Sequence, residues 1–223
     1  GVPALTLVLE RLPATGLMAG VAIVLAVAVA VPAGVIGGAR RGSWADRVVM
    51  SGSLLGQSLP TFWIGLMLIM VFAVGLRWLP TGGFGGIQHL ILPAVTLALW
   101  TGARTARVVR SGMIEQLSLD YVRTAKAKGV APRTVVARHA LRNVLLPVIT
   151  VIGLDLAVLL GGAVVTEVVF AWPGVGRLVV DSIMLRDFPV VQAAVLVISV
   201  IYVLVNLGVD LLYSLIDPRT RLE

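Results

Sequence analysis

The sequence has no cysteine, few charged residues and no motif of a nucleotide-binding or metal-dependent enzyme. The absence of cysteine excludes a disulfide framework and any thiolate metal site. The chain contains no G-x-x-x-x-G-K-[ST] phosphate-binding loop, no dinucleotide fingerprint and no H-E-x-x-H zinc motif. No pattern of a nucleophile with its base is visible either. Any work that this protein performs must therefore draw its energy from another molecule.

Charge is scarce along most of the chain. Only 13% of the 223 residues are charged, against about 25% in soluble domains, and 58% are hydrophobic. Runs of 28, 29 and 26 residues without Asp, Glu, Lys or Arg cover Leu12–Ala39, Val48–Leu76 and Trp78–Ala103. A helix needs about 20 apolar residues to cross a bilayer. Composition therefore predicts a polytopic membrane protein and excludes a soluble globular core.

Five apolar stretches are interpreted as membrane spans, which predicts an all-α membrane bundle over residues 12–223. They cover about residues 12–36, 48–75, 88–103, 144–166 and 189–213. The third is expected to continue as a helix beyond the membrane to about Met113. Residues 1–11 are expected to be a short external lead-in. Because the chain opens without a Met or a charged signal-peptide start, we expect a further span to precede it.

Basic residues indicate the orientation of these spans. Fourteen of the 18 lysines and arginines lie in loop 37–47, loop 104–142 and the C-terminal tail. Positive loops stay in the cytoplasm, so we expect these three segments there. His89 and His139 then lie on opposite sides of the membrane and cannot share a metal. Residues 168–189 are expected outside, as a Trp-Pro-Gly turn followed by a short amphipathic helix at the surface.

Polar residues inside the apolar stretches are candidates for a translocation pathway. Gln57 and Ser58 precede Pro60, a pattern typical of a kink or of a cavity-lining segment. Asp155 lies near the middle of the fourth span, where a carboxylate costs about 2.5–3.5 kcal/mol, and Glu167 lies at its outer end. The alternatives are a structural kink and, for the acids, interhelical hydrogen bonds or an arginine of a partner subunit. If Asp155 lines a pathway, its neutralisation should alter the transport of substrates with a free amine.

Residues 120–148 carry six fixed positive charges and a single acid, Asp120. A short helix is predicted to end at Gly129, which suits the left-handed position after a helix, and Pro132 is suited to open the next one. On these residues alone two interpretations stay open. The segment is either the place where another protein drives the membrane domain or a basic surface helix held by anionic lipids. General physical chemistry favours the lipid interpretation.

The same segment resembles the cytoplasmic loop of the permease subunits of bacterial ATP-binding-cassette importers, in the dipeptide/oligopeptide subfamily. The residues that carry this resemblance are DYVRTAKAKG…RHALRNVLLPV. Further segments agree in order and extend it from about Leu12 to the C-terminus: SLPTFWIGLML, WLPTGGFGG, HLILPAVTLAL, GGAVVTEVVFAWPGVGRL, RDFPVVQ and NLGVDLLYSLIDPRTR. The resemblance implies a type I importer permease fold in the bacterial plasma (inner) membrane.

The resemblance also implies partners and contact sites. Two ATPase subunits would bind ATP and Mg²⁺, so this chain would be neither an enzyme nor a cofactor carrier, and a homologous second permease and an extracytoplasmic binding protein would complete the importer. The residues expected in the helix that couples to the ATPase are Tyr121, Arg123, Thr124, Ala125, Lys126, Ala127, Lys128 and Gly129. Those expected to contact the binding protein are Trp172, Pro173, Gly174, Gly176, Arg177 and Asp187.

Two departures from the family pattern limit what it implies. The wider family has Glu-Ala where this chain has Arg123 and Thr124, which excludes a contact through a glutamate there. Asp155 stands where a neutral residue is usual, so the family assigns it no role. The cargo stays open among dipeptides, longer peptides, glutathione, haem and nickel chelates. The competing class is a secondary transporter or channel with Asp155 or Glu167 as its ion site.

Overall fold

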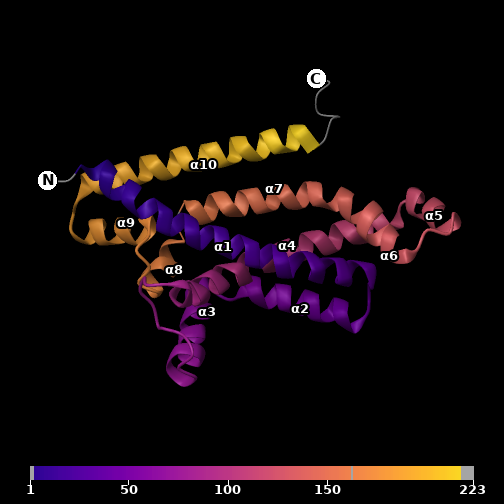
Figure 1. The fold of residues 1–223 in the computed structure, drawn as a ribbon, viewed down its shortest axis with the longest axis horizontal. Helices are drawn as coiled ribbons and strands as arrows, with labels where there is room; N and C mark the ends of the chain where they lie inside the picture. Colours follow the sequence, from indigo (N-terminus) through magenta and orange to yellow (C-terminus); the bar gives the residue numbers. More distant parts are fainter. Residues whose placement is uncertain (1–2, 162, 217–223) are drawn as a thin grey trace.

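The computed structural model describes residues 3–161 and 163–216, with side chains up to Leu212, and every regular element within them is a helix (Figure 1). In chain order the elements are α1 (Ala4–Ala39), α2 (Trp44–Ser58), α3 (Thr61–Leu68), η1 (Ile69–Gly75), α4 (Ile87–Ser118), α5 (Asp120–Ala127), α6 (Pro132–Thr134), η2 (Val135–Ala140), α7 (Leu141–Leu160), α8 (Val164–Val169), α9 (Val175–Met184) and α10 (Phe188–Ile216). The C-terminal tail that we expect in the cytoplasm lies outside the described residues. The all-α class is confirmed for the described part of the chain.

Helices α1 and α4 form the most extensive helix pair, and glycine allows their close approach. A Cβ atom on Gly34 would lie 2.6 Å from the Cβ of Val109, and one on Gly38 would lie 2.5 Å from the Cβ of Met113. Both distances are too short for real carbon atoms, so any larger residue would push the helices apart. The small-residue pair at 34 and 38 is therefore a packing device.

The predicted kink at Pro60 is a full break. Helix α2 ends at Ser58, Leu59 is extended with ψ 132°, and α3 begins at Thr61. Proline disfavours the helical conformation in the residue before it, which explains why the chain opens here. The two arms, 44–58 and 61–75, meet at 103°. In Figure 1, α3 therefore turns away from the bundle that α1, α4, α7 and α10 form.

The expected count of five spans is not confirmed. Three helical stretches are long and apolar enough to cross a membrane, at 4–39, 132–160 and 188–212, and the bent pair 44–75 can supply a fourth. Helix α4 is not in this set, and only its first 17 residues, up to Ala103, precede Arg104. At about 1.5 Å per residue that stretch is slightly shorter than a hydrocarbon core of about 30 Å.

Two helix ends also differ from the sequence predictions. Helix α1 begins at Ala4, so most of the expected lead-in, residues 1–11, continues into the first long helix. Helix α7 ends at Leu160 rather than at Thr166, and α8 follows as a separate short helix. The Trp-Pro-Gly turn is followed by the predicted short helix, which is α9. Figure 1 places α8 and α9 at one end of the bundle and α5 at the opposite end.

Candidate functional site

Three arginines on α4 connect it to other helices. Arg104, Arg107 and Arg110 are three residues apart, so they follow one side of the helix. Arg104 Nη1 lies 2.9 Å from Asp155 Oδ1 on α7, Arg107 Nη2 donates to Gln57 Oε1 on α2, and Arg110 donates to Asp46 on α2. Each of these arginines therefore has a polar partner on a neighbouring helix.

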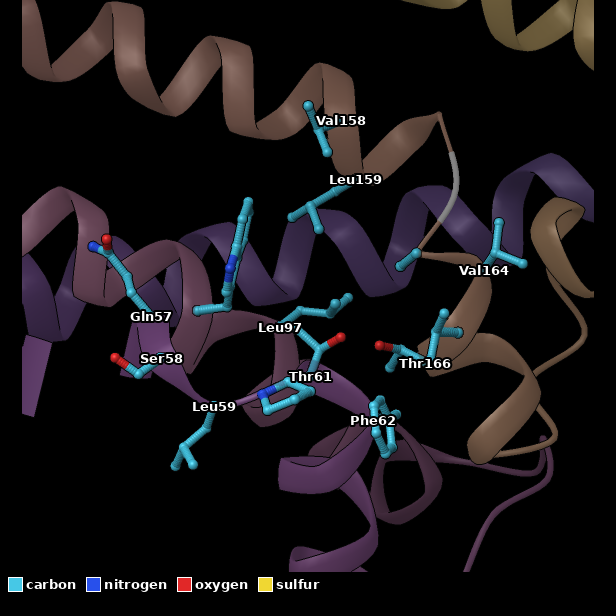
Figure 2. Close-up of a pocket in the computed structure, with 14 residues that line it drawn as sticks. Gln57, Ser58, Leu59, Thr61, Phe62, Leu97, Val158, Leu159, Val164 and Thr166 are labelled. Carbon is cyan, nitrogen blue, oxygen red and sulfur yellow. The ribbon is translucent and has the colours of Figure 1, made fainter. Parts of the chain in front are cut away.

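A cavity of about 490 Å³ lies where the α2–α3 break meets α4, the end of α7 and α8. Its lining includes the predicted pathway residues Gln57 and Ser58 but neither Asp155 nor Glu167. Figure 2 shows Gln57 and Ser58 at one end of this cavity and Val164 and Thr166 at the other. The helix break at Pro60 forms part of the wall. The cavity is mainly apolar, and its polar lining includes Gln57 and Ser58 at one end, Thr166 at the other and Thr61 between them (Figure 2).

Asp155 pairs with an arginine of its own chain. Its side chain is 1% exposed, whereas that of Arg104 is 42% exposed. Asp155 Oδ1 accepts from Arg104, and Oδ2 is buried without a hydrogen-bond partner among the described residues. Asp155 thus forms an interhelical ion pair with an arginine of its own chain, where the sequence left open an arginine of a partner subunit. The charge left accessible at this place is the guanidinium and not the carboxylate.

Glu167 is a buried cap for helix α9. Its Oε2 accepts the backbone N–H of Arg177 at 2.9 Å, and its Oε1 accepts the hydroxyl of Thr15 at 2.7 Å. The Thr15 oxygen in turn accepts the N–H of Val175 at 2.9 Å. Amides in the first turn of a helix lack partners within the helix, and these side chains supply them. The Glu167 carboxyl is therefore engaged in holding α9, and its role in a pathway stays a prediction.

The electrostatic setting of Glu167 agrees with a structural role. Its side chain is fully buried beside Gly174 and Gly176, whose missing Cβ atoms leave the space that the carboxyl occupies. Burial raises the pKa of the Glu167 carboxyl, while hydrogen bonds from Thr15, Arg177 and Gly176 oppose that rise. The positive end of the α9 dipole also favours a carboxylate here. All of these contacts hold the carboxyl in place and leave it no free ion site.

The Trp-Pro-Gly turn is buried where the sequence suggested a contact surface. Trp172 is 1% exposed, its Nε1 donates to the carbonyl of Ala14 at 2.9 Å, and its ring meets Phe84 edge to face. Gly174 and Gly176 are also buried. Of the six residues expected to contact a binding protein, Pro173 and Arg177 are half-buried and Asp187 is exposed. These three are the ones that a partner can reach directly in this conformation.

Helix α5 has the helix-break-helix geometry that the sequence predicts. Gly129 follows it with φ +78°, and Pro132 occupies the first turn of the next helix. Val122 is its one buried residue and anchors it to the bundle. Tyr121 donates to Gln116 of α4 at 2.9 Å, and Asn143 of α7 donates to both. This cluster fixes α5 between the ends of α4 and α7.

The residues expected to dock a partner are accessible on α5 and just after it. Ala125 is half-buried, and the other seven expected residues are exposed. They are Tyr121, Arg123, Thr124, Lys126, Ala127, Lys128 and Gly129. The helix therefore buries one side chain and leaves most of its surface free for contact.

Sequence reasoning missed Thr15, Arg104 and Arg107 as site residues. The two arginines had a signal, because their spacing places them on one helix face and polar residues occur in the neighbouring spans. Thr15 had none, since a single threonine in an apolar helix normally bonds to its own backbone. Within residues 3–161 and 163–216, no group of three metal-ligating side chains is placed to hold an ion.

Residues 30–222 match the family described as the binding-protein-dependent transport system inner membrane component. The chain is 47% identical over 99% of its length to the probable peptide ABC transporter permease protein y4tP of Sinorhizobium fredii (strain NBRC 101917 / NGR234), of which the match covers 73%. It is 48% identical over 89% of its length to the glutathione transport system permease protein GsiC of Escherichia coli (strain K12). That match covers 65% of GsiC, slightly less than two thirds.

Solved structures support the fold. A chain from the inward-facing conformations of the MetNI methionine ABC transporter superposes with a TM-score of 0.81 at 17% identity. The match covers 97% of this chain and 99% of that one. At this identity the likeness describes the path of the backbone only.

Proposed function

The chain belongs to the family of binding-protein-dependent transport system inner membrane components, and from this premise we propose that it is the permease subunit of an ATP-driven peptide importer. Helix α5 would dock into an ATPase subunit, and closure of two such subunits on ATP would move it. The long helices would then change between inward-open and outward-open forms. In this proposal the nucleotide chemistry belongs entirely to the partners.

The fixed position of α5 is the observation that carries the proposal. A helix that transmits force must be held at its ends and be free on its outer surface. Tyr121, Gln116 and Asn143 connect α5 to α4 and α7, and those two helices form walls of the cavity. A push on α5 therefore reaches the cavity through two packed helices. A helix held only by lipid would need no such cluster.

The remaining partners follow from the same proposal. A homologous second permease would complete the pathway, and an extracytoplasmic binding protein would deliver the cargo. On this chain its contact would fall on Pro173, Arg177 and Asp187, the reachable part of the predicted segment, at the opposite end of the bundle from α5. The relatives y4tP and GsiC are named for peptide and glutathione transport, and both names fit a peptide-like cargo.

Gly129→Val tests the coupling role. Gly129 has φ +78°, and a Cβ atom added to it would meet no other atom within 4 Å, so the substitution strains the backbone without creating a clash. We expect loss of transport and of substrate-stimulated ATP hydrolysis in the assembled complex, measured in proteoliposomes. Gly42→Val is the matched control, because Gly42 has φ +80° and equally open surroundings in the loop between α1 and α2.

The two variants separate backbone strain from coupling. We expect Gly42→Val to retain substrate-stimulated hydrolysis and Gly129→Val to lose it at equal abundance in the membrane. Equal activity of the two variants would refute the coupling role of α5. Failure of the chain to form a complex with any nucleotide-binding subunit would refute the importer proposal as a whole.

A further inference from the structure

Charged and polar side chains of three helices lie next to one end of the cavity, and one of them, Gln57, lines it. We call Arg104, Arg107, Gln57 and Asp155 the arginine end. Arg104 follows the cavity-lining residue Trp100 by four positions, which is about one helical turn on the same face of α4. Asp155 precedes Val158, another lining residue, by three positions on α7.

Gln57 completes the arginine end and lines the cavity itself. Arg107 holds this side chain through its amide oxygen. Gln57 therefore connects the cavity to the other members of the arginine end, which lie on α4 and α7 within one helical turn of the lining residues Trp100 and Val158 or bond to Gln57.

The arginine end carries one more positive than negative charge. It has two guanidinium groups and one carboxylate. Arg104 pairs with Asp155, whereas Arg107 pairs with the neutral amide of Gln57, so the charge of Arg107 is not balanced. Among the described residues Arg107 forms no ion pair. The next arginine, Arg110, is already neutralised by Asp46 and adds no net charge.

The hydrogen bonding of the arginine end is also incomplete. The Nε2 group of Gln57 is a buried donor without an acceptor among the described residues. The Arg104 side chain is 42% exposed, so part of its donor fork faces away from Asp155. A carboxylate supplies acceptors for both kinds of donor, and arginine binds carboxylates with two parallel hydrogen bonds. The unused donors and the excess charge both favour an anionic ligand.

We propose that the arginine end selects for the carboxylate terminus of a peptide cargo, with Arg104 and Arg107 as the recognising groups and Asp155 as the residue that positions Arg104. The inference rests on the proposed peptide-importer function. The proposed preference for a carboxylate is the opposite of the expectation from the sequence, in which Asp155 would act on substrates with a free amine. A lone aspartate would select amines, but this aspartate is paired with a guanidinium, and the arginine end as a whole has a net positive charge.

Thiol labelling of the assembled transporter in membrane vesicles tests the sign of this charge without any cargo. The chain has no cysteine, so Val158→Cys introduces a single reporter beside the arginine end. Val165→Cys is the matched control, because both valines line the cavity and they are 51% and 49% exposed. The measured quantity is the ratio of modification rates by an anionic and a cationic thiosulfonate, read from the mass of this chain.

We expect the anionic reagent to be favoured at position 158 relative to position 165. Arg107→Gln removes one charge without leaving a carboxylate unpaired and should lower the ratio at 158 on the order of threefold. Asp155→Asn should raise it by a similar factor. Because the two changes act in opposite directions, general misfolding cannot produce both results. A ratio at 158 that neither substitution moves would overturn the proposal.

Transport with a matched pair of peptides tests selection directly. Trialanine and trialanine amide differ in their terminal carboxylate alone. We expect Arg107→Gln to lower uptake of the free acid relative to the amide severalfold. Both uptakes are measured in the same preparation, so differences in protein abundance or folding do not affect their ratio. An unchanged acid-to-amide ratio would overturn the selection of carboxylates. If the native complex transported neither peptide, the peptide-importer function would fail, and the labelling ratio would still decide the charge of the arginine end.

Discussion

The two ends of the cavity region use a buried carboxylate in opposite ways. At the α8–α9 end, Glu167 has neutral partners, namely the Thr15 hydroxyl and backbone amides of α9. At the arginine end, Asp155 has a charged partner that is itself partly exposed. Both acids lie in apolar surroundings of the same chain, so their sequence contexts look alike. The difference in partners makes one a fixed cap and the other part of a charged site.

This difference has consequences for stability and for function. A carboxylate that caps a helix through neutral partners is held in one position, because moving it leaves the hydroxyl and amide donors without an acceptor. An ion pair with one exposed member can reorganise, because the arginine can exchange its partner for water or a ligand. The structure therefore places its rigid carboxylate under α9 and its adaptable one beside the cavity. Substitutions on each side test whether the two acids differ as described.

Loss of Arg104 should have the largest effect on stability. Arg104→Leu leaves the buried Asp155 without a counter-ion, and breaking such a pair typically costs about 3–5 kcal/mol. Asp155→Leu should cost clearly less, because the remaining Arg104 is partly exposed and can be solvated. Thermal unfolding of the purified protein in detergent measures both. Arg104→Leu combined with Asp155→Leu should be more stable than Arg104→Leu alone. Equal costs for the two single variants would contradict the asymmetry of this pair.

Glu167→Ala should have an intermediate effect. It removes the acceptor of the Thr15 hydroxyl and of the Arg177 amide, and an unsatisfied buried group costs about 1–3 kcal/mol. We expect a lower unfolding temperature and faster proteolysis of the α8–α9 segment. Glu167→Gln keeps a carbonyl acceptor and should cost less than half as much. Resistance of the α8–α9 segment equal to that of the native protein would show that this cap is dispensable.

Thr15→Val should have the smallest effect, on the order of 1 kcal/mol. The change keeps the shape of the side chain and removes the hydroxyl that links Glu167 to the N–H of Val175. Thr96→Val is the matched control. Thr96 is equally buried, but its hydroxyl bonds to Leu92 of its own helix. The difference between the two unfolding temperatures isolates the tertiary link, and no difference would mean that this link does not stabilise α9.

Local sequence signals account for much of the fold. Pro60 predicted a kink where the structure has the break between α2 and α3, and Gly129 with Pro132 predicted the helix break after α5. Each of these residues acts through its own backbone restriction, which is independent of tertiary contacts. The positions of the long helices follow from the uncharged runs in the same way. Segment ends were less well predicted, as α1 and α7 show, because neighbouring packing decides where a helix stops.

Local sequence patterns did not predict which residues the polar side chains contact. Asp155 and Arg104 are 51 positions apart, and Thr15 and Glu167 are 152 apart. Periodicity places a residue on a helix face, but it does not say which other helix that face meets. The predicted pathway set therefore divides in two. Gln57 and Ser58 line the cavity, whereas Asp155 and Glu167 do not, because Asp155 pairs with Arg104 and Glu167 caps α9.

The sequence by itself determined that this protein is a helical membrane component, that the chain bends at Pro60 and breaks after α5, and which loop is positively charged. Those properties depend on composition and on the backbone preferences of single residues. Only the tertiary structure decided that one buried acid caps α9 and that the other lies under an exposed guanidinium. The physical reason is that the role of a charge depends on its partners and its exposure. Both are set by contacts between segments far apart in the chain.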